Sequence, residues 1–163
     1  MIYQFGNYKV DIDAEETRRL YETADTVTEG CDCQNCRNFY HAVDVLPQPV
    51  RDFFEKLGID LRRAFDATGW CREEDGTIHY TGIVMACGSV LEGESPLKRN
   101  DNGSFCWNEV KDLSYQVADR FYVIFRNNNP FREDFSMAEV QIDFMANIPW
   151  VLDEEYTGYY AKE

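Results

Sequence analysis

Three of the six cysteines lie close together in the segment EGCDCQNCRN at residues 29–38. They are Cys31, Cys33 and Cys36, and the residues between them are polar. Zinc at a structural site takes four ligands in a tetrahedron, and a Cys-x-Cys-x-x-Cys turn can supply three of them. A turn with so many polar residues is not expected in an apolar core, so packing alone does not explain three thiols there. The spacing therefore predicts a zinc site with three ligands from this segment and a fourth from elsewhere.

The fourth ligand has to come from another part of the chain. The candidates by residue type are His41, Cys71, His79, Cys87 and Cys106. Cys87 is favoured because it lies near the end of the longest predicted strand, and because Gly88 leaves room for a metal-binding loop to approach the backbone. The prediction is a four-cysteine zinc site of Cys31, Cys33, Cys36 and Cys87. A closed four-thiolate shell has no open position for water, so its metal would be structural and not catalytic.

Other candidates and other interpretations of the cysteines stay open. Cys71 lies on the predicted partner strand, whereas His41 is rotated off the helix face that carries Cys36. Cys106 follows a segment rich in turn residues and would be a poor anchor. Cys33 and Cys36 also form a Cys-x-x-Cys pair that oxidation could switch, but the pair lacks the strand-then-helix setting of thioredoxin-like folds. Ordinary reduced thiols are the remaining interpretation.

Signatures of catalysis are missing from the sequence. It has no GxSxG elbow, phosphate-cradling glycine-rich loop or HExxH helix. The acidic runs at 73–75 and 153–155 are typical of solvated turns. We therefore expect a protein that is not an enzyme. A thiol or metal-dependent enzyme, with a cleft lined by Cys71 and His79, is a less favoured alternative.

The balance of charge restricts the partners that the protein can have. Sixteen basic and thirty acidic residues give a net charge of −14. Direct binding to nucleic acid is not expected, because phosphates require Lys and Arg to displace their counterions. An acidic surface can instead occupy a basic groove made for nucleic acid, although an excess of carboxylates also serves simply to keep a protein soluble.

Aromatic residues are abundant and several lie near carboxylates in the sequence. Aromatic anchors with an acidic rim would suit a basic protein partner, unless these side chains are buried in the core. The residues concerned are Trp107, Trp150, Tyr156, Tyr159 and Tyr160.

The cysteine segment is flanked by predicted helices. A hairpin over residues 3–12, turning at Gly6-Asn7, comes first. Asp13 and Glu16 resemble a capping box for a helix over 14–24. Apolar residues at helical spacing between Phe39 and Leu46 predict a second helix, and Pro49 starts a third that ends at Gly58. A short helical turn is expected over 60–66.

The second half of the chain has the pattern of strands. Residues 70–72 and a long strand over 78–91 predict a hairpin, with Gly82 marking a bulge. Residues 92–104 are rich in turn residues and predict a loop. Further strands are expected over 105–108, 113–118, 121–126 and 137–145, with NNNP at 127–130 as a connector.

Helices gathered before strands indicate an α+β fold, with the N-terminal hairpin and helices on one face of a mainly antiparallel sheet. We expect a single domain over 1–163, with a helical part over about 13–66, a sheet part over about 69–150 and a polar tail over about 153–163. The sequence lacks a membrane-length apolar run, and its first residues lack the pattern of a secretory signal. We therefore expect a cytoplasmic protein that does not bind membranes.

Three segments carry a resemblance: GCDCQNCRNFYHAVDVLPQPVRDFFEKLGID, ACG at 86–88, and MANIPWVLDEE near the end. They resemble a family of small acidic proteins from Gram-positive gut bacteria and their prophages. That family pairs the three-cysteine turn with a cysteine at the position of Cys87. The chain also looks like a type II-A anti-CRISPR protein, a phage-encoded inhibitor of an RNA-guided nuclease.

The resemblance implies a zinc-stabilised inhibitor that works by binding. Its acidic surface would dock on a basic, nucleic-acid-binding protein, a type II CRISPR effector nuclease, and block DNA loading in the cytoplasm of the host cell. A bacterial housekeeping module that binds another protein and holds a structural zinc is the alternative.

Overall fold

The structure is a computed structural model that describes residues 1–93, 98–99, 105–106, 113–128 and 138–160. Its larger sheet is antiparallel and contains, in order across the sheet, β3 (Asp66–Arg72), β4 (Ile78–Ala86), β10 (Val140–Ile148), β9 (Phe121–Asn127) and β8 (Tyr115–Ala118). A second antiparallel sheet contains β1 (Ile2–Phe5), β2 (Tyr8–Ile12) and β5 (Gly88–Glu92).

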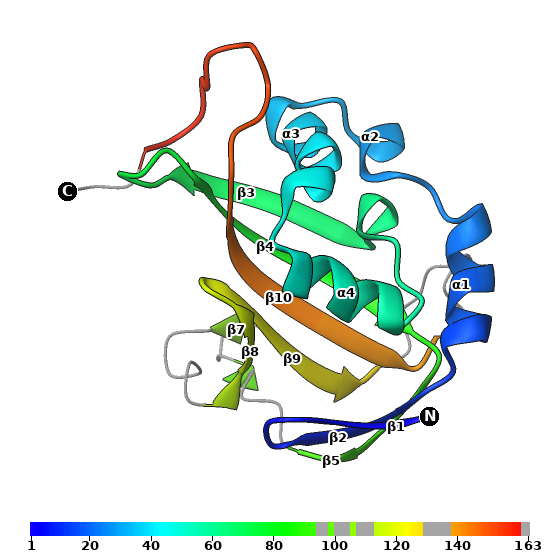
Figure 1. Cartoon of the computed structure of the whole chain (residues 1–163). Helices are drawn as coiled ribbons and strands as arrows, with labels where there is room; N and C mark the ends of the chain where they lie inside the picture. Colours follow the sequence, from blue (N-terminus) through cyan, green and yellow to red (C-terminus); the bar gives the residue numbers. More distant parts are fainter. Residues whose placement is uncertain (94–97, 100–104, 107–112, 129–137, 161–163) are drawn as a thin grey trace.

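The helices lie together on one face of the larger sheet, and the smaller sheet lies below them in the view of Figure 1. They are α1 (Ala14–Thr23), α2 (Val27–Gly30), α3 (Gln34–Ala42) and α4 (Gln48–Lys56), with 3-10 turns η1 (Val43–Val45) and η2 (Leu61–Arg63). The predicted α+β class is confirmed. None of the helices in the described part of the chain is long and apolar enough to cross a membrane.

Most helix boundaries follow from capping residues. The carboxylate of Asp13 accepts a hydrogen bond from the Glu16 amide at 3.0 Å and starts α1 as predicted. Helix α4 ends before Gly58, whose positive φ of 79° favours glycine. Helix α2 was not expected from the sequence, yet Thr26 and Glu29 form a complete capping box at its start.

Aromatic rings join the helices to the sheet. Phe39 of α3 stacks on Phe144 of β10, with ring centroids 5.8 Å apart. Phe144 also lies over Gly82, where an added Cβ would come 2.2 Å from the ring. The predicted bulge at Gly82 is wrong, because the pairing of β4 with both neighbours is regular there. Glycine is required to admit the ring.

The predicted long strand over 78–91 is two strands that belong to different sheets. Strand β4 ends at Ala86, and the chain turns at Cys87 and Gly88 into β5, which pairs with β2. Gly88 has a φ of +142° and lies against the backbone of Asp11, which would be 1.9 Å from an added Cβ. This turn sends Cys87 toward the start of α1.

The segment predicted as a polar tail is docked on the fold. Tyr156 is buried, and its ring contacts Trp150 edge to face at 5.2 Å. Farther along, the carbonyl of Tyr159 accepts a hydrogen bond from the Arg72 amide at 2.7 Å. In Figure 1 this red segment passes beside α3 and returns to the end of β3.

Several expectations fall outside the described residues. They are Trp107, positions 94–97 and 100–104 of the predicted loop, and 129–130 of the connector. Within the predicted loop, β6 (Lys98–Arg99) is described and pairs with β7 (Phe105–Cys106), but the side chain of Cys106 is not described.

Candidate metal centre

The loop between α2 and α3 carries all three clustered cysteines. Cys31 ends α2 in an extended conformation, with φ of −155°. Two residues later Cys33 is the N-cap of α3, and Cys36 lies in its first turn. The loop is therefore held at both ends by helices, which fixes the spacing of the three side chains.

The three sulfur atoms lie within 4.8 Å of one another. The Cys36 amide donates a hydrogen bond to the sulfur of Cys33 at 3.4 Å, so Cys33 caps α3 with its thiol. A tetrahedral zinc ion with Zn–S bonds of ~2.3 Å places its sulfur atoms about 3.8 Å apart. All the described cysteines are free thiols, so the cluster fits a metal ion.

The electrostatics of the cluster differ from one thiol to the next. Burial would raise the pKa of Cys33, but hydrogen bonds from the Cys36 amide and from the other two thiols lower it below its ordinary value overall. Burial, reinforced by the hydrogen bonds with Cys33 and Cys31, raises the pKa of Cys36. One thiol thus ionises readily, while the buried one loses its proton only to a strong partner such as a metal ion.

The first turn of α3 is anchored on the larger sheet. The hydroxyl of Tyr80 donates a hydrogen bond to the Asn35 backbone carbonyl at 2.7 Å, and the side-chain nitrogen of Asn35 donates to the Gly69 carbonyl at 3.2 Å. Asn35 lies so close to Gly69 that an added Cβ would come 2.6 Å from its side chain. The cysteine loop therefore lies over β3 near Gly69.

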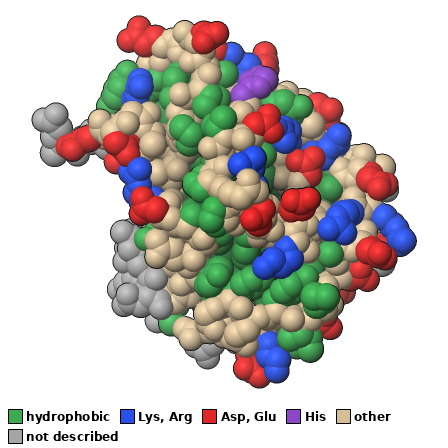
Figure 2. All heavy atoms as spheres, viewed as in Figure 1, with side chains coloured by type: hydrophobic (Ala, Val, Ile, Leu, Met, Phe, Trp, Pro, Cys, Tyr) green, Lys and Arg blue, Asp and Glu red, His purple; other side chains and the backbone are tan. Residues whose placement is uncertain are grey.

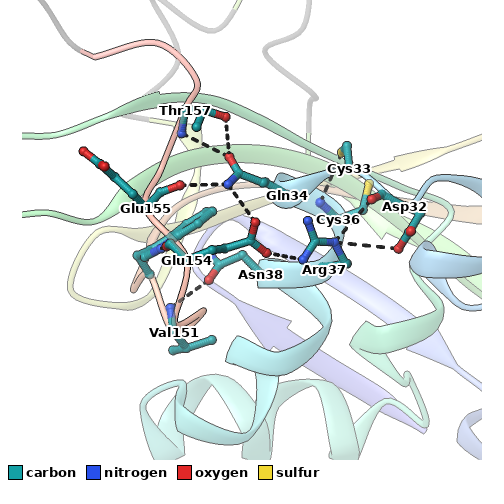
Figure 3. A network of polar contacts seen from close by, with 11 residues as sticks. Asp32, Cys33, Gln34, Cys36, Arg37, Asn38, Val151, Glu154, Glu155 and Thr157 are labelled. Carbon is teal, nitrogen blue, oxygen red and sulfur yellow. Dashed lines mark hydrogen bonds and ion pairs between the residues drawn. The ribbon is translucent and has the colours of Figure 1, made fainter.

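Gln34 ties the same turn to the C-terminal segment (Figure 3). Its side-chain nitrogen donates to the Glu155 carbonyl at 2.8 Å and to the Glu154 carboxylate at 3.0 Å. Its side-chain oxygen accepts from the amide and the hydroxyl of Thr157, at 3.1 and 2.8 Å. One side chain thus fixes three positions of the segment.

Arg37 and Asn38 complete this connection. The Arg37 guanidinium forms an ion pair with Glu154 and hydrogen-bonds the Asp32 carbonyl at 3.3 Å. Asn38 is fully buried and accepts a hydrogen bond from the Val151 amide at 2.8 Å. The structure gives Arg37 and Asn38 the role of holding the C-terminal segment against α3.

Cys87 is not part of the cluster. Its amide donates to the Thr17 hydroxyl at 3.0 Å, and its carbonyl accepts from the Asp13 amide at 2.9 Å, so it is fixed at the start of α1. It follows Tyr80, which anchors α3, by seven residues along β4. An extended chain of that length spans about 23 Å. The predicted four-cysteine set is therefore not assembled, because α3 is anchored near the start of β4 whereas Cys87 follows its last residue.

The alternative ligands whose side chains are described, Cys71, His41 and His79, also lie apart from the three sulfurs. The Cys71 thiol donates to the Glu73 carboxylate at 3.7 Å. His41 is exposed and contacts the Tyr40 ring edge to face. His79 lies 3.5 Å from the Asn147 side chain. Among the described residues, no fourth His, Cys, Asp or Glu completes the cluster.

A pocket of about 700 Å³ opens beside the cluster. Cys31 and Cys36 line it together with the acidic residues Asp25 and Asp66. Sequence reasoning did not connect these carboxylates with the cysteines, because Asp66 reaches the pocket only through the pairing of β3 with β4. The site is thus a three-thiol cluster with an open side.

No family model, curated protein or solved structure matches this chain.

Proposed function

We propose that this protein is a non-enzymatic binding protein that is stabilised by one metal ion at Cys31, Cys33 and Cys36. Zinc is the metal that we expect there. The observation that carries the proposal is the convergence of three sulfur atoms within 4.8 Å in a polar loop. A thiophilic metal ion is the partner that the buried Cys36 thiol needs in order to lose its proton, and it would hold the three sulfur atoms together.

The metal would act on the binding surface through α3. It fixes the loop that begins α3, and the first turn of α3 holds the C-terminal segment through Gln34 and Arg37. That segment carries aromatic side chains to the surface. Metal binding therefore supports a surface far along the chain from the cysteines.

The proposed contact surface, which we term the C-terminal face, combines exposed aromatic rings with carboxylates. Its members are Trp70, Glu74, Glu155, Tyr159 and Tyr160. Trp70 is 56% exposed, Tyr159 is 81% exposed and Tyr160 is 57% exposed. The two acidic residues are also exposed. Tyr160 bridges to Arg72, which brings the C-terminal segment to the strand that carries Trp70. Exposed aromatic rings with an acidic rim suit a basic protein partner.

The helical face is less suited to such a partner. Figure 2 shows Lys and Arg side chains interspersed with Asp and Glu over the helices. Several of these groups form ion pairs, including Arg62 with Asp44 and Arg63 with Asp60. A basic protein would therefore be steered weakly to this side.

The specific partner proposed is a type II CRISPR effector nuclease, whose DNA loading the protein would block. The support for this choice is the net charge of −14, the C-terminal face and the resemblance of the sequence. DNA cleavage by a guide-loaded type II effector, measured with and without the purified protein, tests it. Inhibition is expected for the wild type and for Glu22→Lys on α1. It should be weakened in the double variant Glu74→Lys, Glu155→Lys. Full inhibition by the double variant would contradict this contact surface.

The metal part of the proposal has its own experiment. Protein purified without chelator is expected to contain one zinc per chain, and Cys31→Ser should lose the metal and about 3 kcal/mol of stability, the scale of a saturating tight ligand. Cys87→Ser is the matched control, because this cysteine is buried at the start of α1 and should leave the metal content unchanged. Substoichiometric metal in the wild type would overturn the proposal.

A further inference from the structure

The metal proposed for the cysteine cluster would have one coordination position that the described chain does not fill. Cys31, Cys33 and Cys36 supply three donors, and Cys87 is fixed at the start of α1. Zinc bound to three protein ligands keeps its fourth position for water or another ligand. Sites of this kind are open, in contrast to closed structural sites.

Two of the three cysteines line the pocket of about 700 Å³, so the fourth position of a metal held by them can open onto it. Cys31 and Cys36 both line this pocket, so a metal bound between their sulfurs lies at its wall. The volume is within the range of small-molecule sites, which is roughly 300–1,000 Å³. An exogenous group as large as an aromatic ring can therefore reach the metal.

The charges around the pocket restrict the donor. A divalent metal with three thiolates already carries a net charge of −1. Asp25 and Asp66, which are both exposed acidic residues, also line the pocket. An anionic fourth ligand, such as a thiolate or carboxylate, would add a further negative charge among them. A neutral nitrogen donor avoids this repulsion, and imidazole is a preferred nitrogen ligand of zinc.

We infer that the metal at Cys31, Cys33 and Cys36 binds a neutral imidazole nitrogen from outside the chain at its fourth position, through the pocket lined by Asp25 and Asp66. The inference rests on the metal proposed above. The imidazole can belong to a small heterocyclic ligand or to a histidine of a protein partner, and the donor chemistry is the same in both.

Cobalt-substituted full-length protein provides the test, because the absorption bands of Co²⁺ report its ligands directly. Titration with imidazole is expected to shift the ligand-field bands in a saturable way, with half-saturation at a concentration about tenfold or more below that for acetate or a small thiol. Histidine blocked at both ends forms a second arm. A shift with blocked histidine indicates a partner side chain, whereas a shift with imidazole alone indicates a small ligand.

Two variants separate the alternatives. Cys87→Ser should have the same resting spectrum and the same imidazole response as the wild type, and an altered resting spectrum would show that Cys87 is a ligand and overturn the inference. If imidazole shifted the bands of Asp66→Asn but not those of the wild type, the Asp66 carboxylate would be the fourth ligand of the metal. That result would also overturn the inference. Absence of cobalt–thiolate bands in the wild type would instead overturn the metal proposal itself.

Discussion

Asp143 is a charged residue in the interior of the sheet. Its side chain lies on β10, where it pairs with Arg126 at 3.3 Å and accepts a hydrogen bond from the Gln141 amide at 2.9 Å. Burial raises the pKa of Asp143 above its usual value, although Arg126 opposes the shift. The folded protein therefore binds a proton at this carboxyl more tightly than the unfolded chain does.

We expect Asp143→Asn to change how stability depends on pH. Because the folded pKa is raised, the wild type loses stability as pH rises from the unfolded pKa of about 4 through the folded value. Asp143→Asn has no carboxyl group to titrate at this position. Its free energy of unfolding, compared with that of the wild type, should therefore increase as the pH rises over that range. Urea unfolding at several pH values measures it, with Asp119→Asn as an exposed control. A constant difference between wild type and Asp143→Asn would contradict the raised pKa.

At the same scale, the three clustered cysteines were predictable and the fourth ligand was not. Cys31, Cys33 and Cys36 are close in the sequence, so local backbone geometry suffices to bring their sulfurs together. The position of Cys87 depends on a change of sheet at Gly88, which its strand-like sequence does not reveal. Asp25 and Asp66 likewise line one pocket with the cysteines only in the folded chain.

Helix α3 connects the cysteine loop, the sheet and the C-terminal segment. Its first turn carries Cys36, contacts Tyr80 of β4 through Asn35, and holds the segment through Gln34. The contacts of Gln34 join positions more than a hundred residues apart. A change at the start of α3 should therefore be transmitted to the C-terminal face.

Gln34→Ala tests that connection. It removes the hydrogen bonds to Glu154, Glu155 and Thr157, and we expect a loss of about 1–2 kcal/mol, reduced by the partial exposure of the site. The C-terminal segment should also be cleaved faster by protease. Gln48→Ala is the control, because Gln48 is an exposed glutamine whose hydrogen bonds stay within α4. Equal protease sensitivity of the two variants would argue against the connection.

Gly82→Ala tests the packing of α3 and β10 over β4. An added methyl would lie 2.2 Å from Phe144 and 2.6 Å from the Asp66 carbonyl, so one of them has to shift. We expect a loss of about 2 kcal/mol or more in thermal or urea unfolding. At Gly30, an added Cβ meets no atom within 4 Å, and the matched substitution there should cost less than about 0.5 kcal/mol. Similar costs at the two glycines would show that the Phe144 ring does not require Gly82.

The elements themselves were predictable where local signals are strong. The capping residue Asp13 predicts α1, and Pro49 and Gly58 predict the two ends of α4. The pattern of strand-forming residues predicts β9 and most of β10. Helix α2 was missed because four residues show no apolar periodicity. The C-terminal segment was taken as a tail because its sequence is polar, whereas its docking depends on the buried ring of Tyr156 and on partners in α3.

For the whole molecule, the net charge of −14 should govern association with a basic partner. Electrostatic steering acts over distances that salt shortens, from a screening length of about 10 Å at 0.1 M to about 3 Å at 1 M. We expect the association rate with the type II effector to fall as salt rises, with a smaller change in dissociation. Stopped-flow or surface-based kinetics over a salt series measures this. An association rate that is independent of salt would contradict steering by charge.

The number of sulfur atoms bound to the metal tests the central claim most directly. X-ray absorption at the zinc edge, on protein purified without chelator, distinguishes Zn–S bonds of ~2.3 Å from Zn–N or Zn–O bonds of ~2.0 Å. We expect three sulfur atoms and one lighter donor in the wild type, and the same spectrum in Cys87→Ser. Four sulfur atoms in the wild type, falling to three in Cys87→Ser, would contradict the site formed by Cys31, Cys33 and Cys36 alone.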